Sequence, residues 1–162
     1  MDVKSFIASA TFENPYDALS SNSIGWDYGF QFRNGSSTKG LGEPSSVDYF
    51  ILWADPQDSR QRWVHRRYSR SSGSASGWLT IDQGHIYNLN TLEGEKNILK
   101  ITVSSANINK ASVFVNNEQL TFLDISGADQ SGGSIGVFHG AYKDSSVLGK
   151  VTYVTDFTVW SN

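Results

Sequence analysis

The chain has 162 residues, a net charge of −3, 18% charged residues and 13% aromatic residues. This length suits one domain around one core, and so few charges exclude a disordered or coiled-coil chain, while the acidic balance argues against a nucleic-acid-binding protein. The absence of cysteine excludes disulfides and thiolate metal sites, and no apolar run approaches the roughly 20 residues of a membrane span, so we expect no membrane insertion.

Alternating apolar and polar residues predict β-strands along most of the chain. The alternation begins at residues 6–12 and is clearest at 26–33, where Trp26, Tyr28, Phe30 and Phe32 share one face. Residues 49–53 are apolar at every position, which predicts a strand covered on both faces. Alternation resumes at 98–103 and 113–115, and Asn116-Asn117 then predicts a tight hairpin. Further strands are expected at 122–125, 135–138 and 151–160.

About ten short strands separated by loops rich in glycine and serine predict an all-β domain, a sandwich or a barrel, over residues 1–162. The loops are expected at 35–46, 69–77, 126–134 and 143–149. Large side chains on the apolar faces should form the core, and we also assign Trp53 and Trp160 to it.

Three segments of this sequence are similar to a known type of module: Ala10-Thr-Phe-Glu-Asn-Pro-Tyr16, Trp26-Asp-Tyr-Gly-Phe-Gln-Phe-Arg33 and Asp156-Phe-Thr-Val-Trp160. Together they resemble bacterial modules of the concanavalin A-like lectin/glucanase superfamily, which includes laminin-G-like domains. The resemblance implies a two-sheet antiparallel jelly-roll sandwich whose concave sheet often carries the binding surface. Functions in this superfamily range from sugar binding to protein contact and catalysis.

Catalytic candidates do not form a convincing set. Hydrolysis by paired carboxylates needs two acids about 5 to 9.5 Å apart, and Glu93-Gly-Glu95, which has the spacing, falls in a turn. Gly132-Gly-Ser-Ile-Gly136 matches the nucleophile-elbow pattern, but it leads into a strand and not into a helix. We therefore expect no enzyme and no catalytic residues.

Metal candidates are equally sparse. Four aspartates could supply oxygens to calcium but follow no loop motif, and the three histidines are scattered (Asp124, Asp129, Asp144, Asp156; His65, His85, His139). We expect neither a metal nor a cofactor.

The segment from Arg60 to Arg70 is the strongest local anomaly, because arginines are interleaved there with aromatic residues. On a strand, Arg62, Val64, Arg66 and Tyr68 would face one way, and Trp63, His65 and Arg67 the other. Arginine forks hold carboxylate, sulfate or phosphate, so this pattern is consistent with an anionic or sugar ligand; it is equally consistent with arginine stems covering a sheet face.

The sequence therefore predicts a non-catalytic recognition module, most simply for carbohydrate. The expected ligand-binding residues come from three segments: Gln31, Arg33, Trp63, His65, Arg67 and Trp78. A protein-interaction or structural domain is the alternative, and a glycoside-processing enzyme is a weaker one. The compartment stays open, with an extracellular or cell-envelope setting favoured if the domain is cut from a longer chain; the oligomeric state is also open.

Overall fold

The protein is described from a computed structural model, which covers residues 4–18, 25–34, 46–56, 61–69, 77–126, 133–140 and 149–161, without the side chains of residues 33, 34 and 69. The described ranges contain strands and turns but no helix, as the periodicity predicts. Ten strands follow in chain order: β1 (Phe6–Glu13), β2 (Trp26–Asn34), β3 (Ser46–Ala54), β4 (Gln61–Ser69), β5 (Gly77–Ile86), β6 (Lys96–Ser104), β7 (Asn107–Val115), β8 (Glu118–Asp124), β9 (Ser134–Gly140) and β10 (Tyr153–Ser161).

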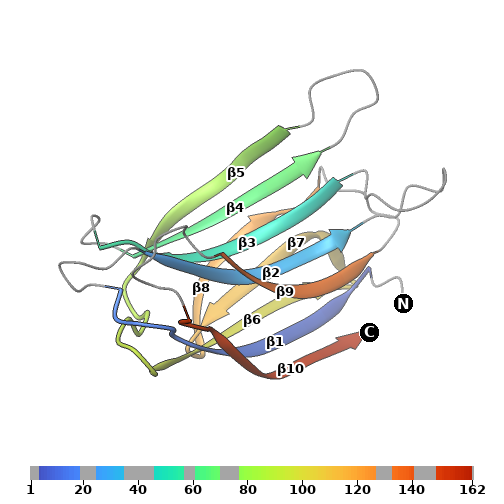
Figure 1. Cartoon of the computed structure of the whole chain (residues 1–162). Helices are drawn as coiled ribbons and strands as arrows, with labels where there is room; N and C mark the ends of the chain where they lie inside the picture. Colours follow the sequence, from blue (N-terminus) through green and yellow to red (C-terminus); the bar gives the residue numbers. More distant parts are fainter. Residues whose placement is uncertain are drawn as a thin grey trace.

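The strands form two antiparallel sheets of five strands that pack face to face. One sheet has the order β10-β1-β6-β7-β8 and the other the order β5-β4-β3-β2-β9, so the chain crosses repeatedly between the two layers. Figure 1 shows the layers one above the other, with their strands bowed in the same direction. The face of the β5-β4-β3-β2-β9 sheet that points away from its partner lies on the inside of this curve. We call it the outer face.

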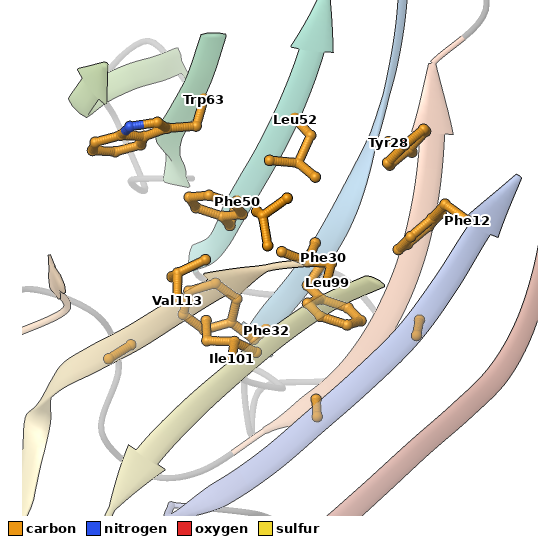
Figure 2. Close-up of a cluster of buried hydrophobic side chains, with 14 of the residues drawn as sticks. Phe12, Tyr28, Phe30, Phe32, Phe50, Leu52, Trp63, Leu99, Ile101 and Val113 are labelled. Carbon is orange, nitrogen blue, oxygen red and sulfur yellow. The ribbon is translucent and has the colours of Figure 1, made fainter. Parts of the chain in front are cut away.

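Alternate side chains of both sheets fill the space between the layers (Figure 2). β1 is buried at every second position, and the expected core face of β2 is confirmed, since Trp26, Tyr28, Phe30 and Phe32 are at most 1% exposed. Phe12 and Tyr28 stack with ring centroids 4.4 Å apart, which joins the two sheets directly.

The predicted hairpin is confirmed between β7 and β8. Asn116 and Asn117 have φ angles of 51° and 69°, the left-handed conformation that asparagine tolerates better than most residues. The Asn116 side chain also accepts a hydrogen bond from the backbone N–H of Ile98, at 2.9 Å. The turn is therefore fixed to the neighbouring strand β6.

Three expectations about burial are wrong: Trp53 and Trp160 are not in the core, and β3 is not covered on both faces. Trp160 is 53% exposed because it pairs with Ile7, whose side chain lies on the face of β1 that points away from the core. The apolar run of β3 is not covered on both faces: Phe50 and Leu52 are buried between the sheets, whereas Tyr49, Ile51 and Trp53 are half-buried on the outer face. Within the described ranges, no third layer packs over them.

No helix in the described part of the chain is long and apolar enough to cross a membrane.

Candidate functional site

Rows of side chains in register across the outer face define the candidate site. One row crosses all five strands from β9 to β5 and consists of Gly136, Gln31, Tyr49, Arg66 and Thr80. Beside it, Tyr68 of β4 is paired with Trp78 of β5. Residues two apart on a strand share a face, so these rows place aromatic and polar side chains together on the outer face. Among the described residues, no further layer covers this face.

Four aromatic side chains from four different strands meet on the outer face, and we call them the aromatic cluster: Tyr49, Tyr68, Trp78 and Phe138. Tyr49 is central, with its ring centroid 4.9 Å from that of Trp78 and 5.4 Å from that of Phe138, both edge to face. Tyr68 and Trp78 are 5.3 Å apart. Trp78 is 56% exposed, so these rings hold one another in place while one indole remains open to a ligand.

Glycine on β9 makes room for the polar side chains of β2. A Cβ atom on Gly136 would lie 3.0 Å from Nε2 of Gln31, and one on Gly140 would lie 2.1 Å from Oδ1 of Asp27. Both glycines face outward in register with these residues. The β9 side of the outer face therefore offers an amide and a carboxyl group, and the β5 side offers aromatic rings.

Asp27 is a partly buried carboxyl group at one end of this face. Burial raises its pKa, and three interactions offset part of this effect: the backbone hydrogen bond from Gly140 and the nearby charges of His139 and Arg66. Its Oδ1 atom is shielded from solvent and has no hydrogen-bond partner among the described residues.

Arg66 lies in the row between Tyr49 and Thr80. Its Nε atom is shielded from solvent without a hydrogen-bond partner, and no carboxylate of the described residues forms an ion pair with it. The residue as a whole is only half-buried. A guanidinium group is thus placed beside the aromatic cluster with hydrogen-bonding capacity left over.

Three of the residues expected to bind a ligand point into the sandwich instead. Trp63 is 6% exposed and packs on Phe50 with ring centroids 5.9 Å apart, as Figure 2 shows, and His65 is fully buried. Arg67 binds Asp48 with two hydrogen bonds, at 2.8 Å and 3.3 Å. In this structure Trp63 and His65 are closed to a ligand, and Arg67 is engaged by an internal acid.

Two of the other three expected residues lie on the outer face. Gln31 lies in the central row and Trp78 in the aromatic cluster, and the two are on opposite sides of Tyr49. Arg33 follows Gln31 on β2, two residues along, although its side chain is outside the described part. The structure therefore brings Gln31 and Trp78 to one surface and separates both from Trp63, His65 and Arg67.

Sequence reasoning missed Tyr49, Tyr68, Phe138 and Arg66 as site residues. A signal was present in β3, where large apolar residues stand at the outward positions as well as the inward ones. An uncovered apolar face of this kind is itself an indication of a binding surface. β4 gave no such signal, since both of its faces mix arginine with bulky residues.

The remaining chemical candidates stay scattered. Glu93 and Glu95 are exposed in the turn before β6, and Asp124 binds the backbone N–H of Ser126 at 2.9 Å. Ser134 begins strand β9, and Asp129 and Asp144 lie outside the described residues. In the described ranges no three His, Asp or Glu side chains gather in a way that could hold a metal ion.

The two packed five-stranded antiparallel sheets form a jelly-roll sandwich, and one of its faces carries the open aromatic cluster. No protein-family model and no curated protein matches the chain. Among solved structures it is similar to sheep galectin-11 in complex with glycerol, with a TM-score of 0.60 and 15% identity over 99% of this chain and 93% of that one.

Two further solved structures are similar to the chain. A double variant of human galectin-16 has a TM-score of 0.53 and 16% identity, covering 100% of this chain and 91% of that one. The PL7 alginate lyase AlyA1 from Zobellia galactanivorans has a TM-score of 0.42 and 10% identity, covering 99% of this chain and 64% of that one. The galectin similarities confirm the predicted fold.

Proposed function

We propose that this chain is a non-catalytic carbohydrate-binding module that holds its ligand on the outer face, over the aromatic cluster. The observation that carries the proposal is the cluster itself, in which Tyr49 and Tyr68 pack against an open Trp78 and Phe138 packs against Tyr49. The galectins that share the fold are lectins, which supports the same class of ligand.

The aromatic cluster suits the apolar side of a sugar. One face of many pyranose rings presents C–H groups, and a flat aromatic ring buries that face while leaving the hydroxyls free. Trp78 is 56% exposed, so much of its apolar surface stays in water after folding. A ligand that covers the indole removes this surface from water, which favours binding.

Polar groups around the cluster supply the hydrogen bonds that a sugar needs. The amide of Gln31 and the hydroxyl of Thr80 each both donate and accept, and Arg66 donates. Arg33, two residues beyond Gln31 on β2, belongs to the same proposed surface. This division between an apolar platform and a few placed polar groups is typical of small-molecule sites.

The proposed module binds without hydrolysis. Glycosidases of the usual mechanism flank the scissile bond with two carboxyl groups. Among the outward-facing side chains that the structure describes on this sheet, Asp27 supplies a single carboxyl group.

A matched pair of tryptophan variants tests the proposal. Trp78 and Trp160 are 56% and 53% exposed and lie on different sheets, so Trp160→Ala controls for loss of an exposed indole. The wild-type chain should bind on a glycan array of neutral and acidic sugars, and the best ligand is then titrated by calorimetry. Trp78→Ala should weaken binding about 10-fold or more, as removal of a central aromatic anchor does, and Trp160→Ala should leave it unchanged.

The proposal would be contradicted if no glycan on the array bound at high protein concentration, or if the two substitutions changed the affinity equally. Thermal unfolding of both variants checks that each one folds.

A protein-contact function is the second candidate, and a specific feature favours it. β10 is an edge strand that exposes several large apolar side chains: Tyr153, Phe157, Val159 and Trp160. Such an edge can take an added strand from a partner. Under this alternative the tryptophan pair behaves in reverse, since Trp160→Ala would weaken association with the partner and Trp78→Ala would not.

A further inference from the structure

Resting on the proposed function, we infer that the outer face selects anionic sugars, whose carboxylate or sulfate group is held by Arg66 while the ring packs on Trp78. The inference starts from the position of Arg66. It lies in register between Tyr49 and Thr80, and its strand neighbour Tyr68 pairs with Trp78.

The guanidinium group of Arg66 lacks the partner that a folded protein normally provides. Its Nε atom is shielded from solvent and makes no hydrogen bond within the described residues. A buried donor left unpaired is unfavourable, so a ligand that supplies an acceptor to this guanidinium group would be stabilised by it. Arg67, the next residue, shows the contrast: it points to the other side of β4 and is bound by Asp48.

The charges of the outer face also favour an anion. Among the outward-facing side chains that the structure describes on this sheet, the formally charged ones are Asp27, Arg62 and Arg66. Asp27 lies two rows away from Arg66, in register with Trp53 and Arg62, and forms no ion pair with Arg66. The part of the face around Arg66 is therefore positive, with the rings of Tyr49 on β3 and Tyr68 on β4 next to it.

Arginine suits this task chemically. Its planar fork can donate two parallel hydrogen bonds to a carboxylate or a sulfate, and such charge-assisted bonds are roughly twice as strong as neutral ones. A neutral sugar would satisfy the same donors with hydroxyl oxygens and gain less. The expected ligand is consequently a glycan carrying uronate or sulfate groups.

Two pairs of ligands, each an anionic glycan and its uncharged counterpart, test the inference. Calorimetry compares tetragalacturonate with its full methyl ester, and a sulfated galactan tetrasaccharide with the unsulfated one. We expect at least one anionic ligand to bind about 10-fold more tightly than its neutral counterpart at low salt, with the preference shrinking as salt rises. The arm that shows the preference distinguishes a carboxylate from a sulfate.

Variants of two arginines on the same strand locate the effect. Arg66→Gln should remove most of the preference, Arg66→Lys should retain part of it, and Arg62→Gln, which removes an equal charge from the same face, should retain all of it. If thermal unfolding shows that Arg66→Gln does not fold, the test uses Arg66→Lys, which should lose part of the preference for the anionic ligand.

The possible failures are distinguishable. Neutral ligands that bind as tightly as anionic ones, and equally well to Arg66→Gln, would overturn the inference while leaving the proposed function intact, provided that Trp78→Ala still weakens binding. An equal loss in Arg62→Gln and Arg66→Gln would overturn it too, because general charge would then explain the preference. If none of the four ligands and no glycan on the array bound, both proposals would be overturned.

Discussion

At the scale of single residues, Asp27 illustrates how burial on a sheet face opposes ionisation. Its carboxyl group lies against Gly140, and burial raises its pKa above the usual value, with the Gly140 hydrogen bond and the charges of His139 and Arg66 acting in the other direction. The folded protein therefore holds a proton on Asp27 more tightly than the unfolded chain does.

This raised pKa predicts a pH-dependent effect of Asp27→Asn. Between the pKa values of the unfolded and folded states, the folded state binds more protons, so the Asp27 contribution to stability falls as pH rises and stays lost above the folded-state pKa. The variant has no charge to bury. Its free energy of unfolding relative to wild type should therefore rise from pH 3 to pH 8, as measured by urea denaturation.

Asp124→Asn is the control of opposite sign. Hydrogen bonds from Ser126 lower the pKa of this exposed carboxyl group, so its favourable contribution is present at neutral pH and lost on acidification. Relative to wild type, Asp124→Asn should lose stability as pH rises. If the difference between Asp27→Asn and wild type stays constant or shrinks as pH rises, the account of Asp27 is wrong.

At the scale of elements, a buried polar network ties strands and loops together at one end of the sandwich. Asn97 on β6 donates to the hydroxyl of Tyr28 on β2 at 2.7 Å, which links the two sheets. Its Oδ1 atom accepts from the backbone N–H of Asn90 at 2.9 Å and from Nδ2 of Asn116 at 3.0 Å. Asn14 joins the network by accepting from the Tyr28 hydroxyl at 3.1 Å.

Asn97→Leu tests the importance of this network. Leucine nearly matches asparagine in size but leaves the Asn90 N–H and the Asn116 amide without their acceptor, which should lower the free energy of unfolding by about 2–4 kcal/mol. Urea denaturation measures the change. Gln119→Leu, at an exposed position of β8, is the control and should change stability by less than about 0.5 kcal/mol. A network variant no worse than the control would contradict the structural role.

At the scale of the whole molecule, the sequence predicts the architecture well because alternation reports burial directly. Trp26, Tyr28, Phe30 and Phe32 line the core as their spacing requires, and the asparagine hairpin forms where two left-handed residues are needed. Alternation within β10 alone does not show which of its faces meets the core, and Trp160 lies on the face that points away from it.

The site was harder to predict, because it depends on which face of β4 meets the core. Trp63 and His65 lie opposite Leu52 and Phe50 in the register of β3 and β4, and Asp48 supplies the counter-charge that lets Arg67 point inward. These pairings join positions distant in sequence, so β4 alone could not reveal them. Tyr49, Tyr68 and Trp78 form a cluster because β3, β4 and β5 are neighbours in the sheet, which no single strand sequence shows.

The most direct test of the central claim is an NMR titration of the chain with the glycan that it binds best. The five tryptophans give separate indole N–H signals, and Trp78→Phe and Trp160→Phe assign the two exposed ones. The account predicts that the Trp78 signal and backbone signals of β3, β4 and β5 move with the ligand while the Trp160 signal stays still. Movement of Trp160 and β10 with an unchanged Trp78 would contradict it.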